Sequence, residues 1–171
     1  MDVKSITNRY TIPQLFLRGI FSTQGMMFLN ILFLTVMTFA IIDMTYLIIN
    51  DVEETESIEK FMTGLATIFV AYGVALEERE FLMKTVGYYP QNQSSYQMNL
   101  DHISHHYGVL LLIVGLVMEV GMQLIKIPDR FIDVISFELL AYSVGFICYL
   151  MIGYWLLHFC YKLIKNEKSR S

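Results

Sequence analysis

Charged residues are scarce in this chain. Asp, Glu, Lys and Arg make up 16% of its 171 residues, whereas 55% are hydrophobic, and the mean hydropathy is +0.49. Soluble domains carry about 25% charged residues and are less apolar. The composition therefore excludes an ordinary water-facing globule and predicts an integral membrane protein.

Positive charge is especially sparse. The 12 Lys and Arg residues stand against 16 Asp and Glu, which gives a net charge of −4, and no basic run occurs outside the last ten residues. Proteins that bind nucleic acid neutralise phosphates with clustered Lys and Arg. The sequence therefore predicts no nucleic-acid partner.

Cysteines and catalytic motifs are also few. Cys148 and Cys160 lie in one apolar segment, twelve positions apart. On a helix that rises about 1.5 Å per residue they are roughly 18 Å apart, too far for a disulfide. We find no glycine-rich phosphate loop, no Ser/His/Asp or Cys/His arrangement and no CxxC pair. Whether the chain is an enzyme stays open at this stage.

Long apolar stretches are what the chain does have. Each of four is near the roughly 20 residues that a helix needs to cross a bilayer, and we predict spans over 26–50, 58–78, 103–126 and 132–161. Residues 1–25 precede this bundle of residues 26–165 as a cytoplasmic or interfacial segment, and 166–171 follow as a basic tail. Within the first segment, Ile12 to Phe21 carries Arg18 among apolar residues and predicts a helix lying in the membrane interface. The fold class predicted is all-α: a four-helix antiparallel membrane bundle with an N-terminal interfacial helix.

Basic residues near the span ends predict the orientation. If the N-terminus is cytoplasmic, that side holds nine of the twelve basic residues and the other side holds three, Lys60, Lys126 and Arg130. We therefore expect a multi-pass protein of the cytoplasmic (inner) membrane with both termini cytoplasmic.

Three acids fall inside the predicted spans. Asp43, Glu119 and Glu138 each lie roughly 10 to 12 Å along a helix from its outer end, so they share one depth. A carboxylate in hydrocarbon costs at least about 2.5 kcal/mol, so each should face the bundle interior, be protonated or find a cation. The acids predict either a proton- or cation-responsive site or hydrogen-bonded structural contacts, with at least one acid protonated.

A second polar group lies at the predicted cytoplasmic side. Carboxylates near the end of the second span and imidazoles from the third and fourth spans reach one membrane level: Glu77, Glu80, His102, His105, His106 and His158. Such ligands suit iron, zinc or manganese between facing helices. A helix N-terminus would also keep His102, His105 and His106 neutral. A haem between His105 or His106 and His158 is the weaker alternative, and the simplest one is that these groups pair with Arg79 and lipid phosphates.

One short motif invites comparison with a known family. The run His102-Ile-Ser-His105-His106 resembles one histidine box of the membrane fatty-acid desaturases and hydroxylases. Those enzymes carry several such boxes, whereas this chain has one, and the ferritin-type Glu-x-x-His pairing is absent. The resemblance covers five residues and does not assign the family.

Two functions of different class follow from the sequence. The first is a His/carboxylate metal-binding membrane bundle, with redox chemistry as one use of the metal. The second is a non-catalytic accessory or scaffold subunit, whose partners besides the lipid bilayer are other membrane subunits or further copies in a homo-oligomer. A proton- or cation-responsive protein that uses Asp43, Glu119 and Glu138 is a further alternative.

Overall fold

The computed structural model describes residues 12–49, 55–85, 87, 89, 94–125 and 134–168. Within these ranges the chain forms helices and no strand, so the all-α prediction is confirmed for the described residues. The helices are α1 (Ile12–Phe21), α2 (Thr23–Ile49), α3 (Thr55–Glu77), α4 (Arg79–Thr85), α5 (Ser95–Ile125) and α6 (Val134–Lys168).

Four of these helices are long and apolar enough to cross a membrane. The apolar stretches run over Thr23–Ile42, Lys60–Glu77, Ser95–Leu124 and Ser143–Lys168. They fall on the four spans predicted from hydropathy, as is typical of a multi-pass membrane protein. Helix α1 covers the residues of the predicted interfacial helix, while its place at a membrane surface stays a prediction.

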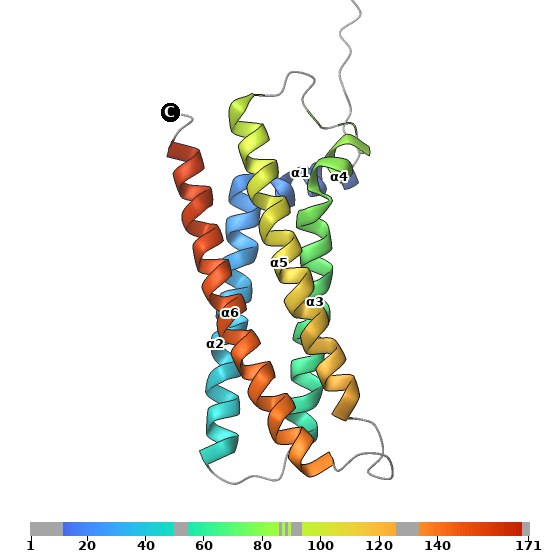
Figure 1. Cartoon of the computed structure of the whole chain (residues 1–171). Coiled ribbons are helices and arrows are strands. Elements are labelled where there is room, and N and C mark those ends of the chain that lie inside the picture. The colour runs from blue at the N-terminus through green and yellow to red at the C-terminus, as the bar shows by residue number, and fades with distance from the viewer. Residues whose placement is uncertain are drawn as a thin grey trace, which may run out of the picture.

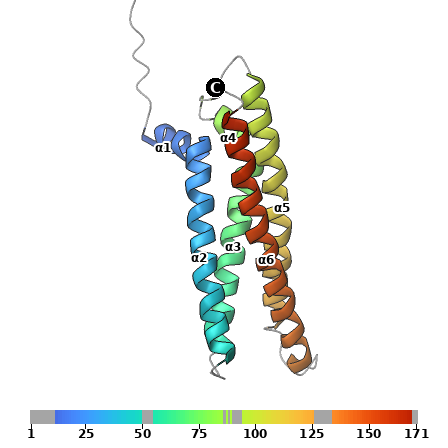
Figure 2. The ribbon, with the colours of Figure 1, turned by 90° about the vertical axis from the view of Figure 1, so that its left-hand side faces the viewer.

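The four long helices lie side by side, and α1 lies across one end of them (Figures 1 and 2). Side-chain contacts tie the helix ends together there. Thr23 Oγ1 of α2 lies 2.5 Å from the Tyr96 hydroxyl of α5, and Asn99 Nδ2 of α5 donates to Asn166 Oδ1 of α6 at 2.6 Å. We call this the α1 end. It holds the start of α2, the end of α3, the start of α5 and the end of α6.

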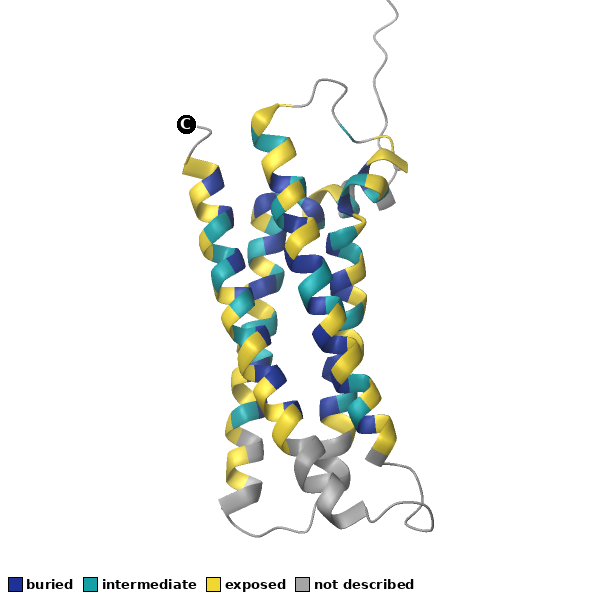
Figure 3. Ribbon diagram, in the orientation of Figure 1, coloured by how far each residue is buried: buried dark blue, intermediate teal, exposed yellow. Residues whose placement is uncertain are grey.

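The core follows the helical period of the apolar residues. In α6, buried side chains recur every three or four positions, so one face of the helix is inside: Tyr149, Ile152, Leu156, Phe159 and Leu163. The opposite face is also apolar, and residues such as Leu150 and Leu157 are exposed on it. Figure 3 shows exposed residues along the outer faces of all four long helices. Helices that are apolar all round require apolar surroundings.

Helices α3 and α5 pack most closely, because glycines let their backbones touch. A Cβ atom on Gly108 would lie 2.5 Å from the Glu77 backbone nitrogen, and one on Gly73 would lie 2.6 Å from the Leu112 backbone nitrogen. Real Cβ atoms essentially never approach backbone so closely. The α3–α5 seam therefore depends on both glycines, and through Glu77 it also positions part of the site described below.

Helix α5 begins eight residues ahead of the predicted span start at residue 103. The Ser94 hydroxyl accepts a hydrogen bond from the Gln97 backbone N–H at 3.2 Å, which is the contact of a helix N-cap. The first turns of α5 are polar, so hydropathy does not assign them to a span, but they are part of the helix. His102, His105 and His106 consequently lie about two or three turns inside α5.

Candidate functional site

An open pocket of about 550 Å³ lies at the α1 end of the bundle. Four of the six predicted metal-ligating residues line it, together with three residues that the sequence did not single out. The lining residues are Glu77, Glu80, Tyr89, Met98, Asp101, His102 and His105. The structure thus brings carboxylates of α3 and α4 to the imidazoles of α5.

The two glutamates reach the pocket from different helices. Glu77 is the last residue of α3, whereas Glu80 lies in the first turn of α4. The two carboxylates therefore come from different helices, and both line the pocket. Glu80 Oε1 accepts a hydrogen bond from Lys84 Nζ at 2.6 Å, and this ion pair is largely exposed. Exposed pairs of this kind contribute little to stability and exchange readily with other ligands.

His102 and His105 are exposed on one face of α5. The premise that these histidines lie at a helix N-terminus is wrong, because α5 starts at Ser95 and the dipole effect falls off within the first turn.

The other two histidines lie outside this pocket. His158 Nδ1 is 2.6 Å from the Tyr107 hydroxyl, and its ring stacks between Tyr154 and Tyr161. His106 is exposed and meets the Tyr107 ring edge-on at 5.6 Å between centroids. His105 and His158 consequently have different neighbours, which gives no support to a haem held between them.

No ready-made ligand set is present in the described part of the chain. Nowhere in those ranges are three or more His, Cys, Asp or Glu side chains arranged so that they could hold a metal ion. The pocket therefore has carboxylates on one side and imidazoles on the other. These side chains would have to change rotamer to bind one metal ion together.

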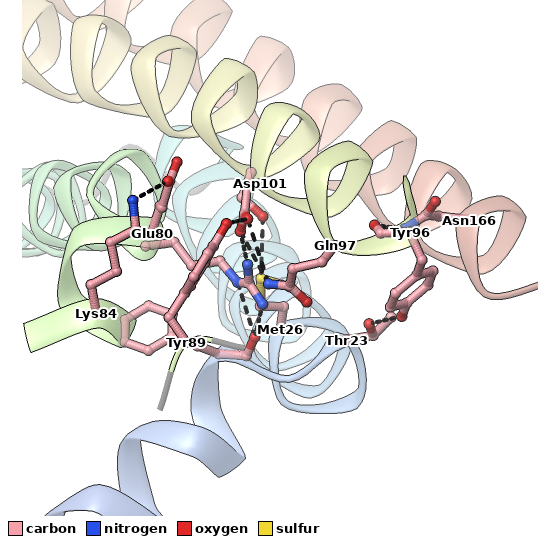
Figure 4. Close-up of polar contacts among 12 residues, drawn as sticks. Thr23, Met26, Glu80, Lys84, Tyr89, Tyr96, Gln97, Asp101 and Asn166 are labelled. Atoms are coloured by element: carbon pink, nitrogen blue, oxygen red, sulfur yellow. Dashed lines mark hydrogen bonds and ion pairs between the residues drawn. The ribbon is translucent and has the colours of Figure 1, made fainter. Parts of the chain in front are cut away.

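Asp101, which lines the pocket, belongs to a buried ion pair that sequence reasoning missed. Arg79 is only 3% exposed, and its Nη1 donates to Asp101 Oδ1. The Tyr89 hydroxyl donates to Asp101 Oδ2 at 2.6 Å, and the Gln97 side chain adjoins the same group (Figure 4). The simplest sequence interpretation had the interfacial histidines and glutamates pair with Arg79. That pairing is not what the structure shows, because the guanidinium faces inward to Asp101 and the Phe21 carbonyl.

Burial and charge act oppositely on this guanidinium. Burial lowers the pKa of Arg79, and the adjacent Asp101 carboxylate raises it. A buried charge is tolerated when it is paired and hydrogen-bonded, and here Arg79 also donates to the Phe21 carbonyl from Nε at 3.0 Å and from Nη2 at 2.9 Å. The ion pair thus joins α1, α4 and α5.

The three predicted intramembrane acids are described unequally. Asp43 and Glu138 belong to α2 and α6, but their side chains lie outside the described residues, so the convergence of the three acids stays a prediction. Glu119 is half-buried at the α3–α5 seam. Its Oε1 accepts from Gln123 Nε2 at 3.2 Å, and its Oε2 lies 3.1 Å from Thr67 Oγ1.

The hydroxyl of Thr67 has two acceptors within hydrogen-bond distance. Thr67 Oγ1 also lies 3.0 Å from the Thr63 carbonyl oxygen. One hydroxyl proton serves one of these acceptors well. Thr67 therefore donates either to Glu119 Oε2 or to the Thr63 carbonyl oxygen, and an amide at position 119 could itself donate to Thr67 while Thr67 donates to Thr63.

Glu119→Gln is therefore expected to change the free energy of unfolding in detergent by less than about 0.5 kcal/mol, as substitutions that keep their contacts do. The amide can donate to Thr67 and accept from Gln123 in the same positions. Glu119→Leu, which loses both contacts, is the matched comparison and should cost more. A large loss in Glu119→Gln, equal to that in the leucine variant, would mean that Glu119 is ionised and paired.

Comparisons with known proteins give this site no precedent. No protein-family model matches the chain, and neither a curated protein nor a solved structure is significantly similar to it.

Proposed function

We propose that this chain is a membrane protein of four antiparallel spans that binds a divalent transition-metal ion in the pocket at its α1 end. The observation that carries the proposal is the gathering of Glu77, Glu80, His102 and His105 around one pocket. Carboxylate and imidazole together suit zinc, iron and manganese. The proposed membrane is the cytoplasmic membrane of a bacterium.

The pocket can form a ligand set by small side-chain movements. His102 and His105 are exposed, so a change of their rotamers meets little packing resistance. Glu80 would exchange its weak contact with Lys84 for the metal. A pocket of about 550 Å³ also leaves space beside one ion for water or a small substrate, which is the open coordination position of catalytic metal sites.

Zinc titration of matched histidine variants tests this proposal. His102→Ala and His105→Ala are each expected to weaken Zn²⁺ binding by more than about tenfold, the least effect seen even for outer-shell groups. His106→Ala and His158→Ala, outside the pocket, are the controls and should bind as the wild type does. Equal binding by all four variants would refute the site.

The antiparallel arrangement with cytoplasmic termini has its own test. It is supported by the charge bias of nine against three and by the helix ends that meet at the α1 end. Reporter fusions at Ser169 and between Asn92 and Ser95 are expected to report the cytoplasm, and a fusion at Glu54 the opposite side. Any other pattern of the three reporters would contradict the topology.

An accessory subunit is the second candidate, and one surface favours it. Tyr154 and Tyr161 of α6 are 65% and 60% exposed, and their rings stack on either side of His158 with interplanar angles of 17° and 11°. Exposed aromatic residues are enriched where membrane helices meet the interface or a partner. If the wild-type protein does not bind Zn²⁺, the accessory-subunit function is favoured.

A further inference from the structure

Asp101 has two roles in the protein: it lines the pocket and it pairs with Arg79. Its carboxylate is part of the pocket wall that carries the proposed metal ligands, and it is also the counter-charge of Arg79. The Asp101 side chain is 10% exposed, so little water reaches its oxygens, which also contact Tyr89 and Gln97. Whatever enters the pocket therefore meets an acid that already holds a buried cation.

The remaining hydrogen bonds of Arg79 hold the end of α1. Nε and Nη2 both donate to the carbonyl of Phe21, which is the last residue of that helix. The last carbonyls of a helix lack donors within it and carry its negative dipole end, so a guanidinium is a favourable cap. Arg79 thus contributes to the attachment of α1 to the bundle.

We infer that a cation bound in the pocket competes with Arg79 for Asp101 and thereby loosens the attachment of α1. The inference rests on the proposed function, since it needs a metal ion in that pocket. A divalent ion near Asp101 attracts the carboxylate and repels the guanidinium, and both effects are strong where little water screens them. A ligand that acts differently on two states shifts the balance between them.

The coupling must operate in both directions. If the metal ion weakens the Arg79 contact, then removing the guanidinium must strengthen metal binding by the same factor. The Arg79→Gln variant is therefore expected to bind Zn²⁺ at least about fivefold more tightly than the wild type does, which is the lower end of typical couplings between two sites. The wild-type measurement below does not depend on the stability of this variant.

Hydrogen–deuterium exchange of the full chain in detergent tests the inference. The readout is exchange of the amides from Ile12 to Met26, with and without Zn²⁺, and Zn²⁺ binding is measured in the same samples. We expect zinc to raise exchange there about fivefold or more. The double variant His102→Ala/His105→Ala is the control, in which zinc should leave exchange unchanged.

Asp101→Asn provides the second arm, because the amide keeps the shape of the side chain and removes its charge. Exchange in α1 should be high without zinc and unaffected by it. If zinc binds to the wild type and exchange of α1 stays the same, the coupling is wrong and the proposed function stands. If zinc does not bind to the wild type at all, the proposed function fails and the coupling fails with it.

Discussion

Replacing Arg79 with Met is expected to lower the free energy of unfolding by about 3 to 5 kcal/mol, the cost of breaking a buried ion pair by removing one partner. The substitution leaves Asp101 buried without its counter-charge and Phe21 without its cap. Thermal or denaturant unfolding in detergent measures the effect. Among the described residues, Arg79 is the one charged residue that is buried.

Lys84→Met is the matched control for that experiment. Lys84 lies five residues further on, and its pair with Glu80 is exposed at both partners, so the loss should be at most about 1 kcal/mol. A double variant, Arg79→Met with Asp101→Leu, should recover part of the stability, because replacing both partners of a buried pair is often nearly neutral. If the Arg79 and Lys84 variants lost equal free energy of unfolding, the buried ion pair would stabilise the protein no more than the exposed one does.

Gly108→Ala is expected to have the second largest effect, a loss of about 1 to 3 kcal/mol or more. The new methyl group would lie 2.5 Å from the Glu77 backbone nitrogen and 2.7 Å from the Gly73 carbonyl oxygen. Backbone cannot turn aside as a side chain can, so α3 and α5 must separate. Because Glu77 also lines the pocket, we expect weaker Zn²⁺ binding in the same variant.

Gly64→Ala and Gly121→Ala are the controls for the seam. They lie on the same two helices, and a Cβ atom at either position would meet nothing within 4 Å. Both should stabilise the chain slightly, by about 0.5 to 1 kcal/mol, because Ala favours a helix interior more than Gly does. A loss of stability at these positions as large as that at Gly108 would refute the close α3–α5 contact.

Hydropathy predicts the number and place of the long helices because each apolar stretch is uniform and near span length. It predicts helix ends less well where polar turns continue the helix, as at the start of α5. Serine is a common N-cap residue, and Ser94 directly precedes these turns, so capping preferences could have predicted the start of α5. Hydropathy also carries no information about which helices are neighbours.

Part of the pocket lining was predicted from the sequence. Spacing and membrane level were sufficient to bring Glu77 and Glu80 near His102 and His105. His158 lies at a similar level but bonds to Tyr107, and a depth argument cannot resolve that difference. Arg79 and Asp101 were missed as a pair because flanking charges are ordinarily assumed to face water. The sequence did contain one indication. Arg79 is the single basic residue in an acidic run, and Asp101 is the single acid at the start of the third span.

Elemental analysis of the purified wild-type chain tests the central claim most directly. The protein is loaded with Zn²⁺, freed of unbound metal by gel filtration, and measured beside the His102→Ala/His105→Ala variant, with an absorbance spectrum to detect haem. The account predicts roughly one metal ion per chain, as a single site requires, and little in the variant. Wild-type protein that retains no metal after loading, or a variant that retains as much as the wild type, would contradict it.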